Sequence, residues 1–275
     1  MGVEVKDIDK NFGSVTAVKN STFDVSDEEI VVLLGPSGCG KTTTLRCIAG
    51  LEKPDSGSIF INGEDVTNKK PKDRRIAFVF QNIALFPHMS VRRNMRFGLD
   101  IQKIGTPDER ENKVKETAEL LQIGELLDRK PSELSGGQQQ RVAVGRALVL
   151  DPNAFLLDEA FANLDANLKI ELRTETKKLQ RELDIATVFV THDQEEAMVL
   201  ADKIVLMNDA IIKQIGSPDN IYNDPNSVFT ARFIGSPKSN LIRGKVNKSN
   251  GEPNFKRQSL EIPLGHLDLE TELSD

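Results

Sequence analysis

The segment from Ile30 to Thr43 constrains the fold of this chain more than any other. Its sequence, IVVLLGPSGCGKTT, places five apolar, mostly β-branched residues before a glycine-rich turn. A helical stretch follows from Thr44 to Ala49, and Gly50 is its expected C-terminal end. Residues 35–42 fit the phosphate-loop pattern G-x-x-x-x-G-K-[ST] without gaps. The alternative is a chance glycine-rich turn, and the flanking strand and helix argue against it.

The residue types in this loop suit the binding of phosphate. Glycines let the backbone curl so that its N–H groups converge on an anion, and the new helix adds its positive N-terminal end. Lys41 is expected to reach the β- and γ-phosphates, and the Thr42 hydroxyl to hold Mg²⁺. The predicted nucleotide-binding residues of the loop are Gly35, Ser37, Gly38, Cys39, Gly40, Lys41, Thr42 and Thr43.

Strand and helix signals alternate along the chain, which indicates an α/β fold with a parallel sheet covered by helices. Short strands are expected from Val3 to Ile8, Val15 to Val18 and Ser21 to Val25, and a hairpin around Asn62-Gly63. From about residue 87 to residue 150 the pattern becomes helical, and we interpret this section as a helical insert.

Polar residues follow three apolar segments that are predicted to be buried strands. These residues are Gln81 after 76–80, Asp158-Glu159 after 154–157, and His192 after 187–190. Ligands of an open parallel sheet bind at the carboxyl ends of its strands, so we expect these side chains beside the phosphate loop. Each of them alone has an ordinary alternative as a cap or a satisfied polar group.

Each of these strand-end residues has a predicted role in chemistry on a nucleotide. Asp158 is placed to hold Mg²⁺ through water, and Gln81 and Thr42 are expected to hold the same ion. Glu159 can polarise an attacking water, and His192 can contact the γ-phosphate or orient that glutamate. Glu159, His192 and Gln81 are therefore the predicted catalytic residues.

A second glycine-rich helix start, LSGGQ, occupies Leu134 to Gln138 and predicts a second anion site. One nucleotide does not need two such sites from one molecule. We therefore expect a dimer in which Ser135, Gly136, Gly137 and Gln138 close on the γ-phosphate held by the partner.

The ordered set of motifs resembles the ATP-binding cassette (ABC) family from Val3 to about Leu241. The motifs are GPSGCGKTT, Gln81, LSGGQ, FLLDE, NLDA at residues 163–166 and THD at residues 191–193. The resemblance implies a P-loop NTPase fold with an antiparallel N-terminal β subdomain, an ATPase activity, and ATP and Mg²⁺ as cofactors. It also implies that Phe12 stacks on adenine, although the ring could be core filler, and that Asp165 belongs to the nucleotide site.

More narrowly, the chain resembles the maltose-type subunit of bacterial and archaeal sugar importers at residues 83–90, 94–95, 98–99, 191–194, 196–198 and 233–237. This implies a nucleotide-binding domain over 1–235 and the start of an OB-like regulatory domain over 236–275. It implies a homodimer or paired cassette that pulls on two transmembrane permease subunits, with a solute-binding protein acting indirectly. The expected location is peripheral, at the cytoplasmic face of the membrane. Another solute, such as a polyamine, iron or sulfate, stays an alternative.

The composition excludes other classes. The 36 basic and 42 acidic residues give a net charge of −6, so no nucleic acid partner is expected. The first ten residues lack an apolar segment, and we expect neither a signal peptide nor a membrane span. A soluble cassette ATPase of DNA repair or translation would have basic arms or long coiled coils, and a phosphate-loop GTPase or kinase would lack the LSGGQ stretch.

Several segments leave alternatives open. The apolar patch from Ile83 to Met89 either docks a permease or packs the helical insert onto the sheet. The basic run from Asn68 to Arg75 is a solvated loop or a contact with an anionic membrane. Cys39 is either partly ionised beside Lys41 or shielded. Five residues depart from the family pattern at turns and partner contacts, namely Glu28, Arg93, Ala160, Ala162 and Ala210.

Overall fold

The computed structural model describes residues 2–80, 84–160, 166–235, 237–249 and 252–264. The chain divides into two compact units, Met1–Thr230 and Ala231–Asp275, and each is described by itself. None of the helices in these described ranges combines the length and the apolar character needed to cross a bilayer.

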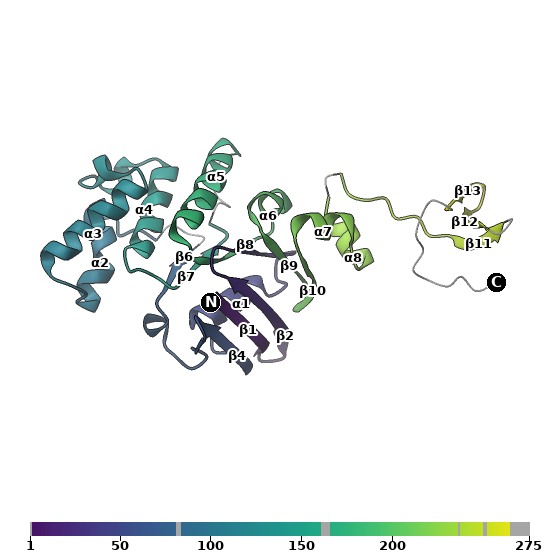
Figure 1. Cartoon of the computed structure of the whole chain (residues 1–275), viewed down its shortest axis with the longest axis horizontal. Coiled ribbons are helices and arrows are strands. Elements are labelled where there is room, and N and C mark those ends of the chain that lie inside the picture. The colour runs from purple at the N-terminus through teal and green to yellow at the C-terminus, as the bar shows by residue number, and fades with distance from the viewer. Residues whose placement is uncertain (1, 81–83, 161–165, 236, 250–251, 265–275) are drawn as a thin grey trace. The chain divides into compact units, whose positions relative to one another are not determined.

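A six-stranded sheet forms the centre of the first unit (Figure 1). Its strand order is β10-β9-β3-β8-β7-β6, and all neighbours run parallel except the β9–β10 hairpin. This confirms the predicted parallel sheet. The strands are β3 (Ile30–Leu34), β6 (Ile76–Val79), β7 (Ala154–Asp158), β8 (Ala186–Thr191), β9 (Lys203–Asn208) and β10 (Ile211–Gly216).

The three central strands β3, β7 and β8 are buried along their whole length. They are continuously apolar because both faces of a parallel sheet are covered. Helix α1 (Lys41–Ala49) packs on β7 and β8, and α6 (Gln194–Leu200) packs on β3 and β8. Helix α5 (Ala166–Leu183) contacts α6. The carboxyl ends of these strands therefore lie next to the N-terminal end of α1.

A second, antiparallel sheet has the order β2-β1-β4-β5 and confirms the predicted N-terminal β subdomain. Its inner residues share one core with β3 and α1. Asn62 and Gly63 both have positive φ and form the predicted hairpin turn. The strands are β1 (Gly2–Phe12), β2 (Val15–Ser26), β4 (Ser56–Ile61) and β5 (Glu64–Asp65).

The prediction of two separate strands at residues 15–18 and 21–25 is wrong, because β2 runs through both. Asn20 takes a left-handed conformation with φ of 45°, and the β1–β2 register shifts between Ile8 and Lys10. The pairing thus absorbs the polar Lys19-Asn20 interruption as an irregularity rather than ending the strand.

Helices fill the section between β6 and β7, as predicted. They are α2 (Val91–Gln102), α3 (Pro107–Leu120) and α4 (Gly136–Leu148), with short 3₁₀ turns at Gly124–Leu126 and Pro131–Glu133. Side chains of Ser90, Thr106 and Ser135 cap their N-termini. Met95, Leu99, Val114 and Ala118 are buried and form the apolar side of this helical segment.

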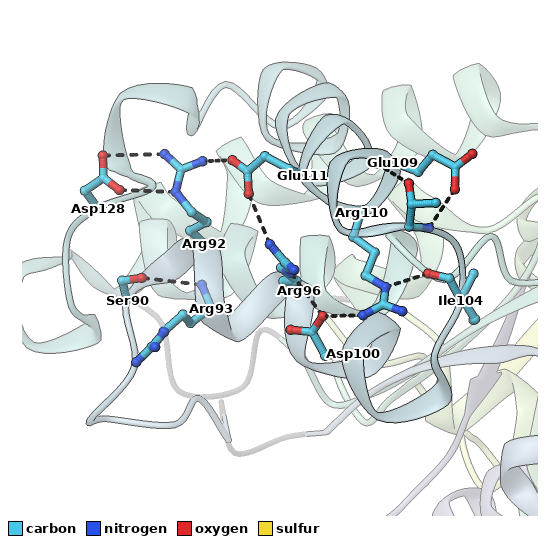
Figure 2. A network of polar contacts seen from close by, with 11 residues as sticks. Ser90, Arg92, Arg93, Arg96, Asp100, Ile104, Glu109, Arg110, Glu111 and Asp128 are labelled. Atoms are coloured by element: carbon cyan, nitrogen blue, oxygen red, sulfur yellow. Dashed lines mark hydrogen bonds and ion pairs between the residues drawn. The ribbon is translucent and has the colours of Figure 1, made fainter.

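The polar side of the helical segment carries a network of ion pairs (Figure 2). Arg92 pairs with Glu111 and, at 3.2 Å, with Asp128. Asp100 accepts from Arg96 at 3.0 Å and from Arg110 at 2.9 Å. These contacts tie α2 to α3 and to the loop that precedes α4.

Small elements follow β10 in the described part of the chain. Helix α7 (Pro218–Asn223) packs on β9 and β10, and α8 (Val228–Phe233) crosses the division between the units. In the second unit, β11 (Lys245–Ser249), β12 (Glu252–Arg257) and β13 (Leu260–Pro263) form an antiparallel sheet. Its assignment as the start of an OB-like domain over 236–275 stays a prediction.

Candidate nucleotide site

The loop between β3 and α1 curls tightly against its neighbours. Gly40 has φ of 107°, and a Cβ atom there would lie 2.2 Å from the carbonyl oxygen of Ala17. A Cβ atom at Gly35 would lie 2.2 Å from the carbonyl oxygen of Met207. Only glycine allows these approaches, which bring β2 and β9 against the loop. Gly50 ends α1 with φ of 72°, as predicted.

Lys41, the first residue of α1, points its ammonium group at neutral groups of the loop. Lys41 is 4% exposed, and its ammonium donates to the carbonyl oxygens of Gly35 at 2.8 Å and Pro36 at 2.9 Å. A buried cation that is held by carbonyl oxygens attracts an anion strongly, because little water screens it. This arrangement suits a phosphate group.

A pocket of about 170 Å³ opens at this loop. Its lining brings together residues from β2, the phosphate loop, α1 and the end of β7, namely Ala17, Ser37, Gly38, Gly40, Lys41, Thr42, Thr43 and Glu159. The sequence did not single out Ala17, because an alanine that faces the loop through its backbone leaves no side-chain signal.

Thr42 and Asp158 form an oxygen pair beside the pocket. The Thr42 hydroxyl donates to Asp158 Oδ1 at 2.9 Å, and Asp158 is 6% exposed. Burial raises the pKa of the Asp158 carboxyl, and the Thr42 hydrogen bond partly opposes this. A hydroxyl and a carboxylate are ligands that Mg²⁺ takes in proteins. Among the described residues, no three His, Cys, Asp or Glu gather into a separate metal site.

Glu159 and His192 meet at the ends of β7 and β8, as the sequence predicted. His192 Nδ1 lies 3.2 Å from Glu159 Oε1, and the Glu159 backbone N–H donates to Val190 O at 3.0 Å. Glu159 has φ of 47°, a left-handed conformation that is costly for a residue with a side chain. The backbone thus turns sharply at the residue that lines the pocket from the end of β7.

The other predicted residues lie apart from this pocket or outside the described residues. Gln81 and Asp165 belong to the latter group. Ser135 is the N-cap of α4, where it and Gln138 form a reciprocal capping box through hydrogen bonds of 3.0 and 3.3 Å. The pocket lining does not include the LSGGQ stretch. Phe12 is 48% exposed at the end of β1, with the Lys10 ammonium 5.1 Å from its ring centroid.

The expectation of a partly ionised Cys39 is wrong. Cys39 is 4% exposed, and burial raises the pKa of its thiol more than the nearby Lys41 charge lowers it. The alternative of a shielded thiol is confirmed. Cys47 is also buried, and burial raises the pKa of its thiol to about 11.

The sequence of this chain is similar to one family model and to ATP-binding proteins of importers. Residues 18–162 match the family model described as "ABC transporter". The xylose/arabinose import ATP-binding protein XacJ of Haloferax volcanii is 51% identical over 95% of this chain and 67% of its own length. The trehalose/maltose import ATP-binding protein MalK of Thermococcus litoralis is 52% identical over 90% of this chain and 68% of its own length.

Solved structures resemble the fold as well. An ATP-binding cassette of an ABC transporter in its ADP conformation superposes with a TM-score of 0.74 at 26% identity, covering 83% of this chain and 97% of that one. A dimeric ATP-binding cassette bound to ADP and Pi superposes with a TM-score of 0.68 at 31% identity, covering 78% of this chain and 98% of that one.

Proposed function

This chain belongs to the ABC transporter family, and we propose that within it the protein is the ATP-hydrolysing subunit of an importer of a carbohydrate-type solute. The observation that carries the ATPase proposal is the position of Glu159. Glu159 lines the same pocket as Lys41 and Thr42, and its Oε1 atom lies 3.2 Å from His192 Nδ1. A base, a cation and a hydroxyl thus converge where a γ-phosphate would lie.

In this proposal, different side chains bind the phosphates, hold the metal ion and activate the attacking water. Lys41 and the loop amides bind the β- and γ-phosphates, and Thr42, Asp158 and Gln81 hold Mg²⁺. The bound metal ion would neutralise charge on the phosphates. Glu159 accepts a proton from the attacking water, and His192 orients Glu159 and contacts the γ-phosphate.

The remaining parts of the proposal concern partners. Two copies would sandwich two ATP molecules. The site of one copy would be completed by residues of the other, namely Ser135, Gly136, Gly137, Gln138 and Asp165. Phe12 would stack on adenine. The exposed positions of Ser135 and Phe12 suit this role. The dimer would act on two permease subunits at the cytoplasmic face of the membrane, served indirectly by a solute-binding protein, without nucleic acid.

The catalytic proposal is tested by Glu159→Gln, with Glu125→Gln on the exposed surface as the matched control. Loss of the base should lower ATP hydrolysis by about 10² or more while ATP binding stays intact. With ATP, the variant should accumulate as a dimer in size-exclusion chromatography. A variant that hydrolyses ATP within threefold of the wild type, or stays monomeric at high concentration, would exclude this role.

The permease contact is tested at residues 84–89. Phe86 is half-buried and packs on Phe97 with ring centroids 4.6 Å apart, so a change there would also disturb α2. Leu85 is half-buried too, and Leu85→Ser is the sharper probe. We expect it to keep the ATPase activity and thermal stability of the isolated subunit but to lose co-purification with the permease. A variant that still co-purifies would place the contact elsewhere.

The solute class requires a separate test, since the cassette itself does not touch the solute. The carbohydrate proposal follows from the names of the relatives. This subunit, reconstituted with the permease and the solute-binding protein, should show ATPase activity that a pentose or a disaccharide stimulates. If only a polyamine, iron or sulfate stimulates the activity, the proposed solute class is wrong, whereas the ATPase proposal still holds.

A further inference from the structure

A cluster of acidic and basic side chains, two of them buried and two partly exposed, joins α5 to α6. We define the α5–α6 ion cluster as Lys169, Arg173, Asp193 and Glu196. Arg173 is 8% exposed and Glu196 is 3% exposed. The Arg173 Nη2 atom lies 3.4 Å from Asp193 Oδ2 and 3.4 Å from Glu196 Oε1, and Lys169 Nζ lies 3.9 Å from Glu196 Oε1.

The cluster contains two basic and two acidic side chains, but the contacts between them are long and some hydrogen bonds are not made. Among the described residues, neither Arg173 Nε nor Glu196 Oε1 has a hydrogen-bond partner, and the contacts between the guanidinium and both carboxylates are long. A buried ion pair with unmade hydrogen bonds is a poor source of stability, because desolvation offsets the attraction. The cluster therefore calls for a role other than stabilising the fold.

The cluster holds both neighbours of His192. The Thr191 hydroxyl donates to Glu196 Oε2 at 2.6 Å and accepts from the Asp193 backbone N–H at 2.9 Å. Asp193 Oδ1 caps α6 by accepting from the backbone N–H groups of Glu195 at 2.9 Å and Glu196 at 3.3 Å. The chain on each side of His192 is thus fixed to α6, and α6 is fixed to α5 through Arg173.

We propose that Arg173 and Glu196 are positioning residues for hydrolysis, which hold the end of β8 so that His192 stays against Glu159. The proposal rests on the ATPase function proposed above. Neither side chain touches the pocket, so neither should contribute to nucleotide affinity. A displacement of His192 by about 1 Å would suffice to slow the chemical step strongly, since catalysis depends on orientation.

The test separates position from stability by means of four variants. Arg173→Gln and Glu196→Gln each leave the cluster with one excess charge, whereas the double variant keeps one cation and one anion and so restores the balance. Glu196→Gln retains an oxygen that can accept from Thr191. Arg173→Lys keeps the cation, and Lys178→Gln, on the exposed side of α5, is the matched control.

We expect kcat for ATP to fall about tenfold in both single variants and in the double variant, with KM and nucleotide affinity within twofold of wild type. The melting temperature should recover in the double variant while kcat does not, and Arg173→Lys should restore part of kcat. Hydrogen exchange of the nucleotide-free single variants should rise in the segment 190–197 and not in the control.

Three results would overturn the proposal. One is a folded double variant whose kcat recovers together with its melting temperature, since the cluster would then act only on stability. Another is kcat within twofold of wild type in the folded single variants. The third is failure of even Arg173→Lys to fold, which would make the cluster a determinant of folding. If the wild type itself does not hydrolyse ATP, the proposed function fails instead, and the exchange data still report on the cluster.

Discussion

Arg74 presents a stringent test of how the phosphate-loop helix is held in place. It is 3% exposed, and its guanidinium donates to four backbone carbonyl oxygens. Two of them end α1, Cys47 O at 2.8 Å and Ile48 O at 2.7 Å. The others are Thr67 O and Lys69 O, both at 3.0 Å, in the loop before β6. A positive charge at the C-terminal end of a helix is itself favourable.

Replacement by methionine keeps an unbranched apolar stem and removes all four hydrogen bonds. Each hydrogen bond to a charged group contributes about 1.5–3 kcal/mol, and the oxygens left behind lose solvation. Cys47 O retains the Gly50 N–H at 3.1 Å, and the methionine regains apolar contact, so the full sum is not lost. We expect a loss of about 3–5 kcal/mol in the free energy of unfolding, from a total on the order of 5–15 kcal/mol.

The assay is thermal unfolding of the nucleotide-free protein, with urea titration as a second measure. A loss of this size lowers the melting temperature by about 10 °C in a domain of this length. The melting temperature of Arg74→Lys should lie between those of the wild type and Arg74→Met, because an ammonium has three donors and no fixed plane. Lys72→Met, two residues away and exposed, is the control. An Arg74→Met melting temperature within 2 °C of wild type would refute the reasoning.

Four further outcomes are expected. Asp158→Asn should raise the melting temperature of the nucleotide-free protein in EDTA, increasingly as the pH rises above the ordinary pKa of an aspartate. Burial raises the pKa of this carboxyl, so its contribution to stability is present below its ordinary pKa and is lost as the pH rises through the folded value. Maleimide should label Cys39 at least ~10-fold more slowly than an exposed thiol at pH 7, and urea should remove the difference. Ala210→Gly should add about 1 kcal/mol of stability, since Ala210 has φ of 65°, and an unchanged urea midpoint would contradict this. Arg92→Gln should lower the melting temperature at low salt, and 1 M NaCl should shrink the effect because its ion pairs are partly exposed.

The sequence predicts the phosphate loop well because its requirements are local. Five buried residues, glycines at close approaches and a following helix suffice to fix the loop, and the structure has β3, Gly40 and α1 in these roles. Glu159 and His192 were also predicted to meet, because the carboxyl ends of adjacent parallel strands share one edge.

Other features depend on contacts between distant segments and leave no local signal. Arg74 belongs to a basic run that is typical of a solvated loop, yet it is buried because helix α1 ends beside it. Arg173 looks like one charge among many on α5, and only the packing on α6 gives it carboxylate partners. The local signal at Cys39 was misleading for the same reason, since burial outweighs the neighbouring cation.

The nucleotide-free site combines several features that cost free energy. Lys41 and Asp158 are both nearly inaccessible to water, one held by carbonyl oxygens and the other with its pKa raised by burial. Glu159 takes a left-handed conformation where the chain turns into the pocket. A packed apolar site of the same size would avoid each of these costs. The two buried charges become favourable only when an anion meets the ammonium and a cation meets the carboxylate. The fold therefore holds in place the charges that a magnesium–nucleotide complex would neutralise, and the proposed ligand is the species that would relieve both electrostatic costs at once.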